Sequence, residues 1–286
     1  MAASVELKRT DEFSFRECLP DEDKGAPPVL LVHGFPESSR MWEPLMQELA
    51  GLGRRSLAPD LYCLGDSPDP GPATYERNVG ALEHFCEHAF HNEQRVLVIV
   101  HDWGGFIGLT WACRNRKRVE ALVLSDTGFF SDGRWHGVAE MLRSDQGEAA
   151  IAAFDKDAFA ALLRADGADF SDEDVDAYWR PFEHGRGREA TLEFYRDMDF
   201  EKLAPHEGCL AEMAVPTLIL WGEDDTFAPL SGARRFNREI PGSDLVVVPG
   251  AGHFVFETEP ERCLRVVADF VAALPELPAT GDLPPP

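Results

Sequence analysis

The chain has 286 residues, 44% hydrophobic and 27% charged, which is the composition of an ordinary globular protein with ample length for a packed core. Its 27 Lys and Arg against 51 Asp and Glu give a formal net charge of −24. Such a surface repels phosphate backbones and anionic lipid, so we expect no nucleic-acid or membrane partner but a small neutral organic substrate. An alternative origin of the acidic surplus is a saline habitat.

Short apolar runs alternate with amphipathic segments along most of the chain. Runs without period-two alternation are typical of strands buried on both faces of a mostly parallel sheet. They lie at residues 29–32, 95–100, 121–124, 215–221 and 245–248. Helices are expected near 39–51, 75–91, 106–115, 230–240 and 259–273, and a leading antiparallel hairpin at 5–8 and 12–17. The alternation predicts a doubly wound α/β fold.

The alternation is interrupted between residues 128 and 213, where helical segments rich in Asp and Ala replace strong strand runs. We interpret this stretch as a helical cap inserted over the carboxyl edge of the sheet. The predicted organisation is a core in two parts, 1–127 and 214–275, with the cap at 128–213 between them. A Pro-rich tail at 276–286 is expected to be disordered.

The ends of the chain and its cysteines predict a cytoplasmic protein. The amino terminus has no apolar segment of the kind found in secretion signals, and no stretch has the roughly 18 apolar residues that span a bilayer. The six cysteines are scattered without a CxxC pair. This favours thiols in a reducing compartment over disulfides or a metal site. We expect a monomer or a homodimer.

An apolar run leads directly into the motif HDWGG at residues 101–105. A buried strand, a polar residue flanked by glycines and then a helix form the pattern of a nucleophile elbow, which lifts one side chain above the sheet. That side chain is Asp102, whose carboxylate is stabilised at a helix N-terminus. A carboxylate that attacks carbon forms an ester, which suits an alkyl halide or an epoxide. The alternative interpretation is that Asp102 is only an N-cap.

Other polar motifs follow other predicted strands. After the first run, HGFP at 33–36 places the amide of Phe35, together with that of Trp103, to face a developing oxyanion. Asp225 and His253 follow later runs, so nucleophile, acid and base occur in the chain order of an α/β-hydrolase triad. The alternative acid is Asp126, which follows the run at 121–124.

With its HGFP, HDWGG, GEDD and GAGH motifs, the sequence resembles the α/β-hydrolase superfamily from about residue 29 to 270. The resemblance is to the branch with an Asp nucleophile, the epoxide hydrolases and haloalkane dehalogenases. It implies that Asp102 attacks the substrate carbon and that His253, oriented by Asp225, activates the water that hydrolyses the ester. It implies neither a metal nor an organic cofactor.

The residues available to assist the leaving group divide between two activities. Tyr195 falls where epoxide hydrolases have their second cap tyrosine, although no tyrosine occurs between residues 128 and 177 to serve as the first. A departing halide instead requires N–H donors, and Trp103 supplies one. The family's cap tryptophan position falls near Phe154, so Trp135 or Trp179 must substitute. We expect an epoxide hydrolase that forms a vicinal diol. The alternatives are a haloalkane dehalogenase and a non-catalytic ligand-binding member of the fold.

Overall fold

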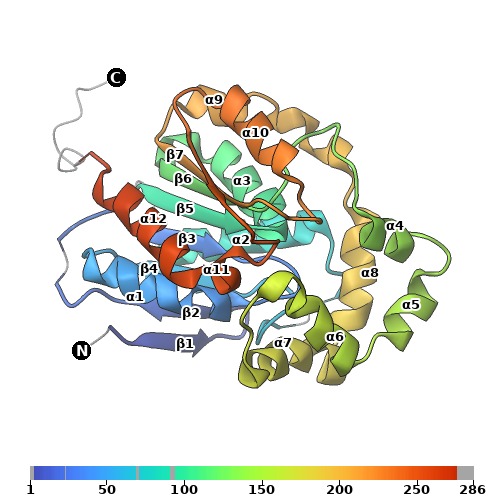
Figure 1. Ribbon diagram of the computed structural model, residues 1–286. Coiled ribbons are helices and arrows are strands. Elements are labelled where there is room, and N and C mark those ends of the chain that lie inside the picture. The colour runs from blue at the N-terminus through green and yellow to red at the C-terminus, as the bar shows by residue number, and fades with distance from the viewer. Residues whose placement is uncertain (1–2, 23, 69–70, 91–93, 276–286) are drawn as a thin grey trace.

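The computed structural model describes residues 3–22, 24–68, 71–90 and 94–275, so the predicted tail at 276–286 lies outside the described residues. One eight-stranded sheet has the order β1-β2-β4-β3-β5-β6-β7-β8 (Figure 1). The strands are β1 (Val5–Arg9), β2 (Ser14–Cys18), β3 (Val29–Val32), β4 (Ser56–Pro59), β5 (Val96–His101), β6 (Val119–Ser125), β7 (Thr217–Gly222) and β8 (Asp244–Val248). The β1–β2 and β2–β4 pairs are antiparallel and the others are parallel. The predicted hairpin and α/β sheet are confirmed.

Helices cover both faces of the sheet (Figure 1). One face packs against η1 (Ser39–Trp42), α1 (Glu43–Gly51) and α12 (Pro260–Ala272). The other packs against α2 (Tyr75–Ala89), α3 (Trp103–Arg114) and α10 (Leu230–Glu239). Successive residues of a strand point to opposite faces, so Leu30 and Val32 enter one core while Val29 and Leu31 enter the other. Each such side chain contributes about 1.5–3 kcal/mol on burial.

Two details of the core differ from the prediction. The sequence analysis missed β4, because the four residues of Ser56–Pro59 include a serine and a proline and form no long apolar run. It also began the third helix at residue 106, whereas α3 begins at Trp103. The glycines permit this early start, because a Cβ on Gly104 would lie 2.1 Å from the Val32 carbonyl oxygen. The helix can therefore approach β3 closely only with glycine at this position.

A set of short helices lies between β6 and β7; α4 to α8 project to one side of the sheet, whereas α9 lies beside α10 (Figure 1). They are α4 (Gly137–Arg143), α5 (Gly147–Ala153), α6 (Lys156–Leu163), η3 (Ala165–Gly167), α7 (Asp172–His184), α8 (Gly187–Asp197), η4 (Phe200–His206) and α9 (Cys209–Met213). Aromatic side chains form much of their packing, including Trp179 stacked on Phe182 at 5.5 Å between ring centroids. Division into a core and a cap domain at the stated boundaries stays a prediction.

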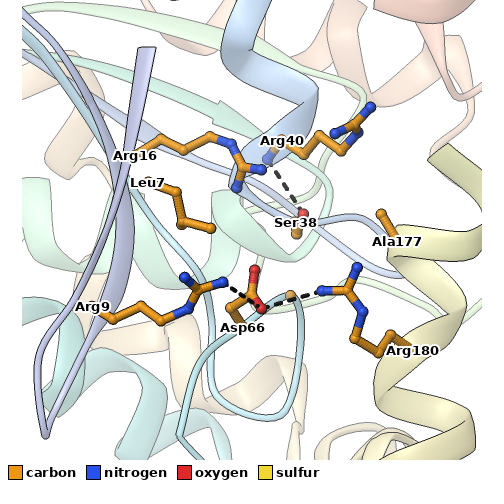
Figure 2. Close-up of a pocket in the computed structure, with 9 residues that line it drawn as sticks. Leu7, Arg9, Arg16, Ser38, Arg40, Asp66, Ala177 and Arg180 are labelled. Atoms are coloured by element: carbon orange, nitrogen blue, oxygen red, sulfur yellow. Dashed lines mark hydrogen bonds and ion pairs between the residues drawn. The ribbon is translucent and has the colours of Figure 1, made fainter. Parts of the chain in front are cut away.

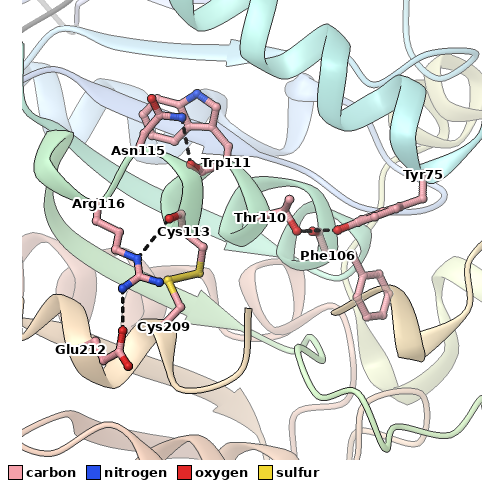
Figure 3. The surroundings of a disulfide bond; sticks show 9 residues. All are labelled: Tyr75, Phe106, Thr110, Trp111, Cys113, Asn115, Arg116, Cys209 and Glu212. Carbon is pink, nitrogen blue, oxygen red and sulfur yellow. Dashed lines mark hydrogen bonds and ion pairs between the residues drawn. A yellow bond between two sulfur atoms is a disulfide. The ribbon is translucent and has the colours of Figure 1, made fainter. Parts of the chain in front are cut away.

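Two cysteines contradict the expectation that all six are thiols. Cys113 of α3 and Cys209 of α9 form a disulfide across 96 residues of sequence (Figure 3). Arg116 and Glu212 form an ion pair beside it. The pairing escaped the sequence analysis because no local spacing links cysteines this far apart. The cytoplasmic location, which rested partly on free thiols, stays a prediction. Within the described residues, no helix is both long and apolar enough to cross a membrane.

Candidate active site

Asp102 stands at the carboxyl end of β5 in a conformation that L residues rarely adopt, with φ of 46° and ψ of −122°. Its carbonyl oxygen accepts hydrogen bonds from the Thr127 hydroxyl (2.6 Å) and the Gly105 amide (2.9 Å), which hold the turn in place. Opposite it, a Cβ on Gly34 would lie 2.3 Å from the Cβ of Asp102. The sharp turn thus projects the carboxylate from the sheet edge into space that only a glycine leaves open.

The three residues of the predicted triad meet at this edge. Nδ1 of His253 lies 2.9 Å from Oδ2 of Asp225, and Nε2 of the same ring lies 3.5 Å from Oδ2 of Asp102. Two further bonds, from the amides of Phe227 and Ala228, fix Oδ1 of Asp225. The imidazole is therefore held between two carboxylates, one anchored by the backbone and the other at the turn.

These contacts shift the pKa of all three groups. Burial lowers the pKa of His253, but the charge of Asp225 and the hydrogen bond with Asp102 outweigh it and raise that pKa well above its usual value. Burial raises the pKa of Asp102, but the hydrogen bond and charge of His253 bring it below normal. The pKa of Asp225 is likewise lowered by His253 against the effect of burial. The site therefore favours two carboxylates and a protonated imidazole.

The predicted oxyanion-hole residues lie beside the carboxylate. The Phe35 amide donates a 2.6 Å hydrogen bond to Oδ1 of Asp102. Trp103 is the first residue of α3, so its amide is among those that a helix N-terminus leaves without an intrahelical partner. The two aromatic rings stack with their centroids 4.8 Å apart. The Phe35 amide therefore contacts the carboxylate directly, and ring stacking joins its loop to the start of α3.

Asp126, the alternative acid, is fully buried but points elsewhere. Its Oδ1 accepts from the Gly222 amide at 2.9 Å and its Oδ2 from the Ser125 hydroxyl at 2.6 Å. Burial, followed by the charge of Asp225, raises the pKa of Asp126 well above its usual value. A carboxyl group that resists ionisation and bonds the backbone is suited to holding β6 and β7 together. Asp225, and not Asp126, contacts the imidazole of His253.

Tyr195 and Trp135 come from the segment between β6 and β7 and join Trp103 beside Asp102. The Tyr195 ring lies 4.9 Å from that of Trp103 and 5.1 Å from that of Trp135. Within the described part of the chain, the buried indole Nε1 of Trp135 has no hydrogen-bond partner. Burial raises the pKa of Tyr195 well above normal, and the charge of Asp102 raises it further. The cluster thus contains a neutral phenol and an unpaired N–H donor.

The other two aromatic candidates lie farther from the nucleophile. Phe154 packs against Phe159 and Trp179, at 6.1 and 6.4 Å between ring centroids. Phe159 in turn contacts Phe182, and only Phe182 reaches Phe35. Phe154 and Trp179 therefore belong to the packing between α6 and α7, whereas Trp135 contacts Tyr195 directly.

The sequence analysis missed a buried polar group behind the imidazole. His101 and Glu37 are both fully buried, with Nε2 of His101 3.6 Å from Oε2 of Glu37. The His101 ring lies 5.0 Å from that of His253, and burial lowers the pKa of His101 to about 3. Burial, together with the neighbouring Glu257, raises the pKa of Glu37 well above normal. Glu37 and His101 were visible within the HGFPE and HDWGG stretches, but nothing in the sequence paired them.

Comparison with known proteins agrees with this geometry. A family model described as the alpha/beta hydrolase fold matches residues 27–260. A haloalkane dehalogenase of Sphingobium indicum is 31% identical over 278 residues, covering 89% of this chain and 91% of the relative. One from Mycolicibacterium smegmatis is 30% identical over 277 residues, covering 88% of this chain and 86% of the relative.

Solved structures show the same fold. A loop variant of a haloalkane dehalogenase from Bradyrhizobium elkanii has a TM-score of 0.79 at 22% identity, covering 95% of this chain and 97% of that one. A 2-hydroxy-6-oxo-6-phenylhexa-2,4-dienoate hydrolase from a Rhodococcus strain has a TM-score of 0.78 at 18% identity, covering 95% and 100%. Proteins with different substrates thus share this architecture.

Proposed function

Because the chain belongs to the α/β-hydrolase superfamily, in its branch of haloalkane dehalogenases and epoxide hydrolases, we propose that this hydrolase is a haloalkane dehalogenase. It would convert a small haloalkane and water into an alcohol, a halide ion and a proton. The observation that carries the proposal is the unpaired indole N–H of Trp135 beside the cluster of Trp103 and Tyr195. A leaving halide needs such donors, and the relatives described above are named for this activity.

In the first step, Oδ2 of Asp102 attacks the carbon that bears the halogen. This oxygen is the available one, because Oδ1 already accepts the hydrogen bond from the Phe35 amide. A C–O bond forms as the carbon–halogen bond breaks, and the halide leaves with the bonding electrons. The product is an alkyl ester of Asp102, with the indole N–H groups of Trp103 and Trp135 as donors to the halide.

In the second step, water attacks the ester carbonyl carbon of Asp102. Esterification removes the negative charge that helps to keep His253 protonated, so the pKa of the imidazole falls and it loses a proton. Neutral His253 then accepts a proton from the attacking water, while the Phe35 amide stabilises the oxyanion. Collapse of this intermediate breaks the C–O bond to the alkoxide, which takes the proton from His253 and leaves as the alcohol. Asp102, released as a carboxylic acid, then gives its proton to His253, which restores the carboxylate and the protonated ring. Asp225 orients the ring throughout.

A second candidate, epoxide hydrolysis, is favoured by one observation. The raised pKa of Tyr195 keeps its hydroxyl protonated next to Asp102, as a donor to an opening epoxide must be. The same Asp102 ester and the same water step then yield a diol. The two activities therefore differ only in the donors that assist the leaving group, which are Trp103 and Trp135 for a halide and Tyr195 for an oxygen.

Two substrates with the same four carbons separate these candidates. Purified protein is given 1-bromobutane or 1,2-epoxybutane, and bromide and diol are measured. We expect bromide release with little diol. Trp135→Phe should reduce bromide release about tenfold or more, because one charge-assisted hydrogen bond is lost. Its matched control, Tyr195→Phe, should retain most of that rate. Diol formation without bromide release, or full activity of Trp135→Phe, would contradict the proposal.

A further inference from the structure

A pocket of about 240 Å³ lies where the sheet edge meets the helix α7 (Figure 2). Four of the nine residues that line it are arginines, from β1, β2, η1 and α7, and they are Arg9, Arg16, Arg40 and Arg180. Its described lining includes none of the triad, oxyanion-hole or leaving-group residues. Such a concentration of guanidinium groups is unusual in a chain with a net charge of −24. The pocket therefore calls for a separate explanation.

Two of these arginines share a single carboxylate oxygen. Arg9 and Arg180 point toward each other across Asp66, with Nη2 and Nη1 at 3.0 and 3.2 Å from its Oδ1 (Figure 2). The Asp66 backbone is fixed by a hydrogen bond from its amide to Oδ2 of Asp60. Two guanidinium groups thus face one carboxylate at this end of the pocket.

The other two arginines are already compensated but hold the wall in place. Arg16, whose side chain is 9% exposed, donates from Nε to Glu43 at 2.6 Å and from Nη1 to the Ser39 hydroxyl at 2.8 Å. Within the described residues its Nη2 group has no such partner. Arg40 pairs with two carboxylates of α7, Asp174 at 2.8 Å and Glu173 at 3.2 Å. This wall therefore retains one donor from a nearly buried guanidinium.

We propose that this pocket binds a small organic anion through a carboxylate or phosphate group held between Arg9 and Arg180. The guanidinium fork matches oxyanions of this shape, and Arg16 and the Ser38 hydroxyl add donors on the inner wall. Leu7 and Ala177 provide apolar surface for the organic part. A water occupies about 30 Å³ in the liquid, so the pocket has room for more than a bare ion.

Such a ligand would join two parts of the molecule. Arg9 lies on the edge strand β1, whereas Arg180 lies on α7 in the segment between β6 and β7. An anion between them would supply the negative charge that Asp66 alone does not, so binding should stabilise the docking of α7 against the sheet. This inference does not depend on the reaction proposed for Asp102.

The test is calorimetric titration of the full chain with succinate and with inorganic phosphate, each against sodium chloride of equal ionic strength. Saturable binding is expected. Succinate alone indicates a carboxylate ligand, phosphate alone a phosphate ligand, and either result supports the site. Arg9→Gln and Arg180→Gln should each weaken binding about tenfold or more. The control Arg116→Gln removes an exposed arginine that is paired with Glu212 elsewhere, and binding should not change.

Asp66→Asn separates a binding site from a simple set of ion pairs. If the pocket binds anions, removal of the competing carboxylate releases both guanidiniums, and affinity should rise several-fold. If the arginines only fasten α7 to the sheet, the variant lowers the unfolding temperature without improving binding. The proposal is overturned if neither anion binds beyond the chloride control, or if Asp66→Asn fails to bind more tightly while remaining folded.

Discussion

Nε2 of His253 lies 3.5 Å from Oδ2 of Asp102, the carboxylate oxygen that the Phe35 amide leaves free. The two oxygens of one side chain therefore have different neighbours, an amide at Oδ1 and an imidazole near Oδ2. A water that contacts this ring would lie close to the carboxyl carbon of an Asp102 ester. The same arrangement of Asp102, Phe35 and His253 is thus suited to both steps of the proposed reaction, formation of the ester and its hydrolysis.

The first prediction concerns the ester. In His253→Gln, alkylation should proceed while hydrolysis slows by about a thousandfold or more, because the base is missing. Mass spectrometry after incubation with 1-bromobutane should find the chain heavier by one butyl group on Asp102. In wild-type enzyme turned over repeatedly in ¹⁸O-water, label should enter the same residue. An unlabelled Asp102 would rule out the ester.

A second prediction follows from the shifted pKa values. The lowered pKa of Asp102 keeps it ionised in mild acid, so alkylation should persist there. Hydrolysis instead requires neutral His253. In the ester the charge of Asp225 still raises the pKa of this ring although the charge of Asp102 no longer does, so the protonated fraction of the ring grows as pH falls. The steady-state fraction of ester should therefore increase from pH 8 to pH 5, as measured by rapid quenching and mass spectrometry. An ester fraction that is independent of pH would contradict the role of His253 as base.

Asp225 and Asp126 are both buried, so their Asn variants form a matched pair. Asp225→Asn should reduce kcat about a thousandfold or more, because an amide neither fixes the ring tautomer nor stabilises the imidazolium. Asp126→Asn should reduce kcat far less and act mainly on the unfolding temperature, because Asp126 bonds Gly222 and Ser125 instead of the ring. Equal losses of kcat in the two variants would assign the acid role to both.

Gly34→Ala tests how tightly the turn is packed. The added methyl group would lie 2.3 Å from the Cβ of Asp102 and 2.4 Å from its Oδ1, so the carboxylate must move. We expect kcat to fall by a hundredfold or more, with a stability loss of about 1–3 kcal/mol. Gly80→Ala is the control, since its Cβ would meet nothing within 4 Å. Normal turnover by Gly34→Ala would contradict the geometry of the turn.

The raised pKa of Glu257 predicts how the free energy of unfolding depends on pH. Burial raises the pKa of this carboxyl from 4.5 to about 8, so the folded chain keeps a proton that the unfolded chain releases. The free energy of unfolding should therefore fall as pH rises from 5 to 8, by at most about 1.4 kcal/mol per unit for one such group. Denaturant titrations of Glu257→Gln should give a flatter curve than wild type or exposed Glu261→Gln. An unchanged slope would refute this account.

The apolar runs and the polar motifs that follow them were enough to predict most strands of the core. They also predicted that the triad residues lie at one edge of the sheet. An apolar run such as residues 29–32 indicates a strand that is buried on both faces of the sheet. The polar residue after each run lies at the carboxyl end of that strand. Contacts between distant segments were not predictable in this way. Glu37 and His101 occur in recognisable motifs, yet only the folded sheet brings them together behind His253. The pairing of Arg9 with Arg180 across Asp66 has the same origin.

The disulfide between Cys113 and Cys209 turns the chain from α3 to α9 into a closed covalent ring. The ring contains β6 and nearly all the residues between β6 and β7, including Trp135 and Tyr195. A protease that cut the chain once between α5 and α6 would therefore leave two fragments that the disulfide still joins, with each new end attached to the sheet. Trp135 and Tyr195, the donors proposed for the leaving group, thus lie in a segment joined to the core both by the peptide chain and by the disulfide.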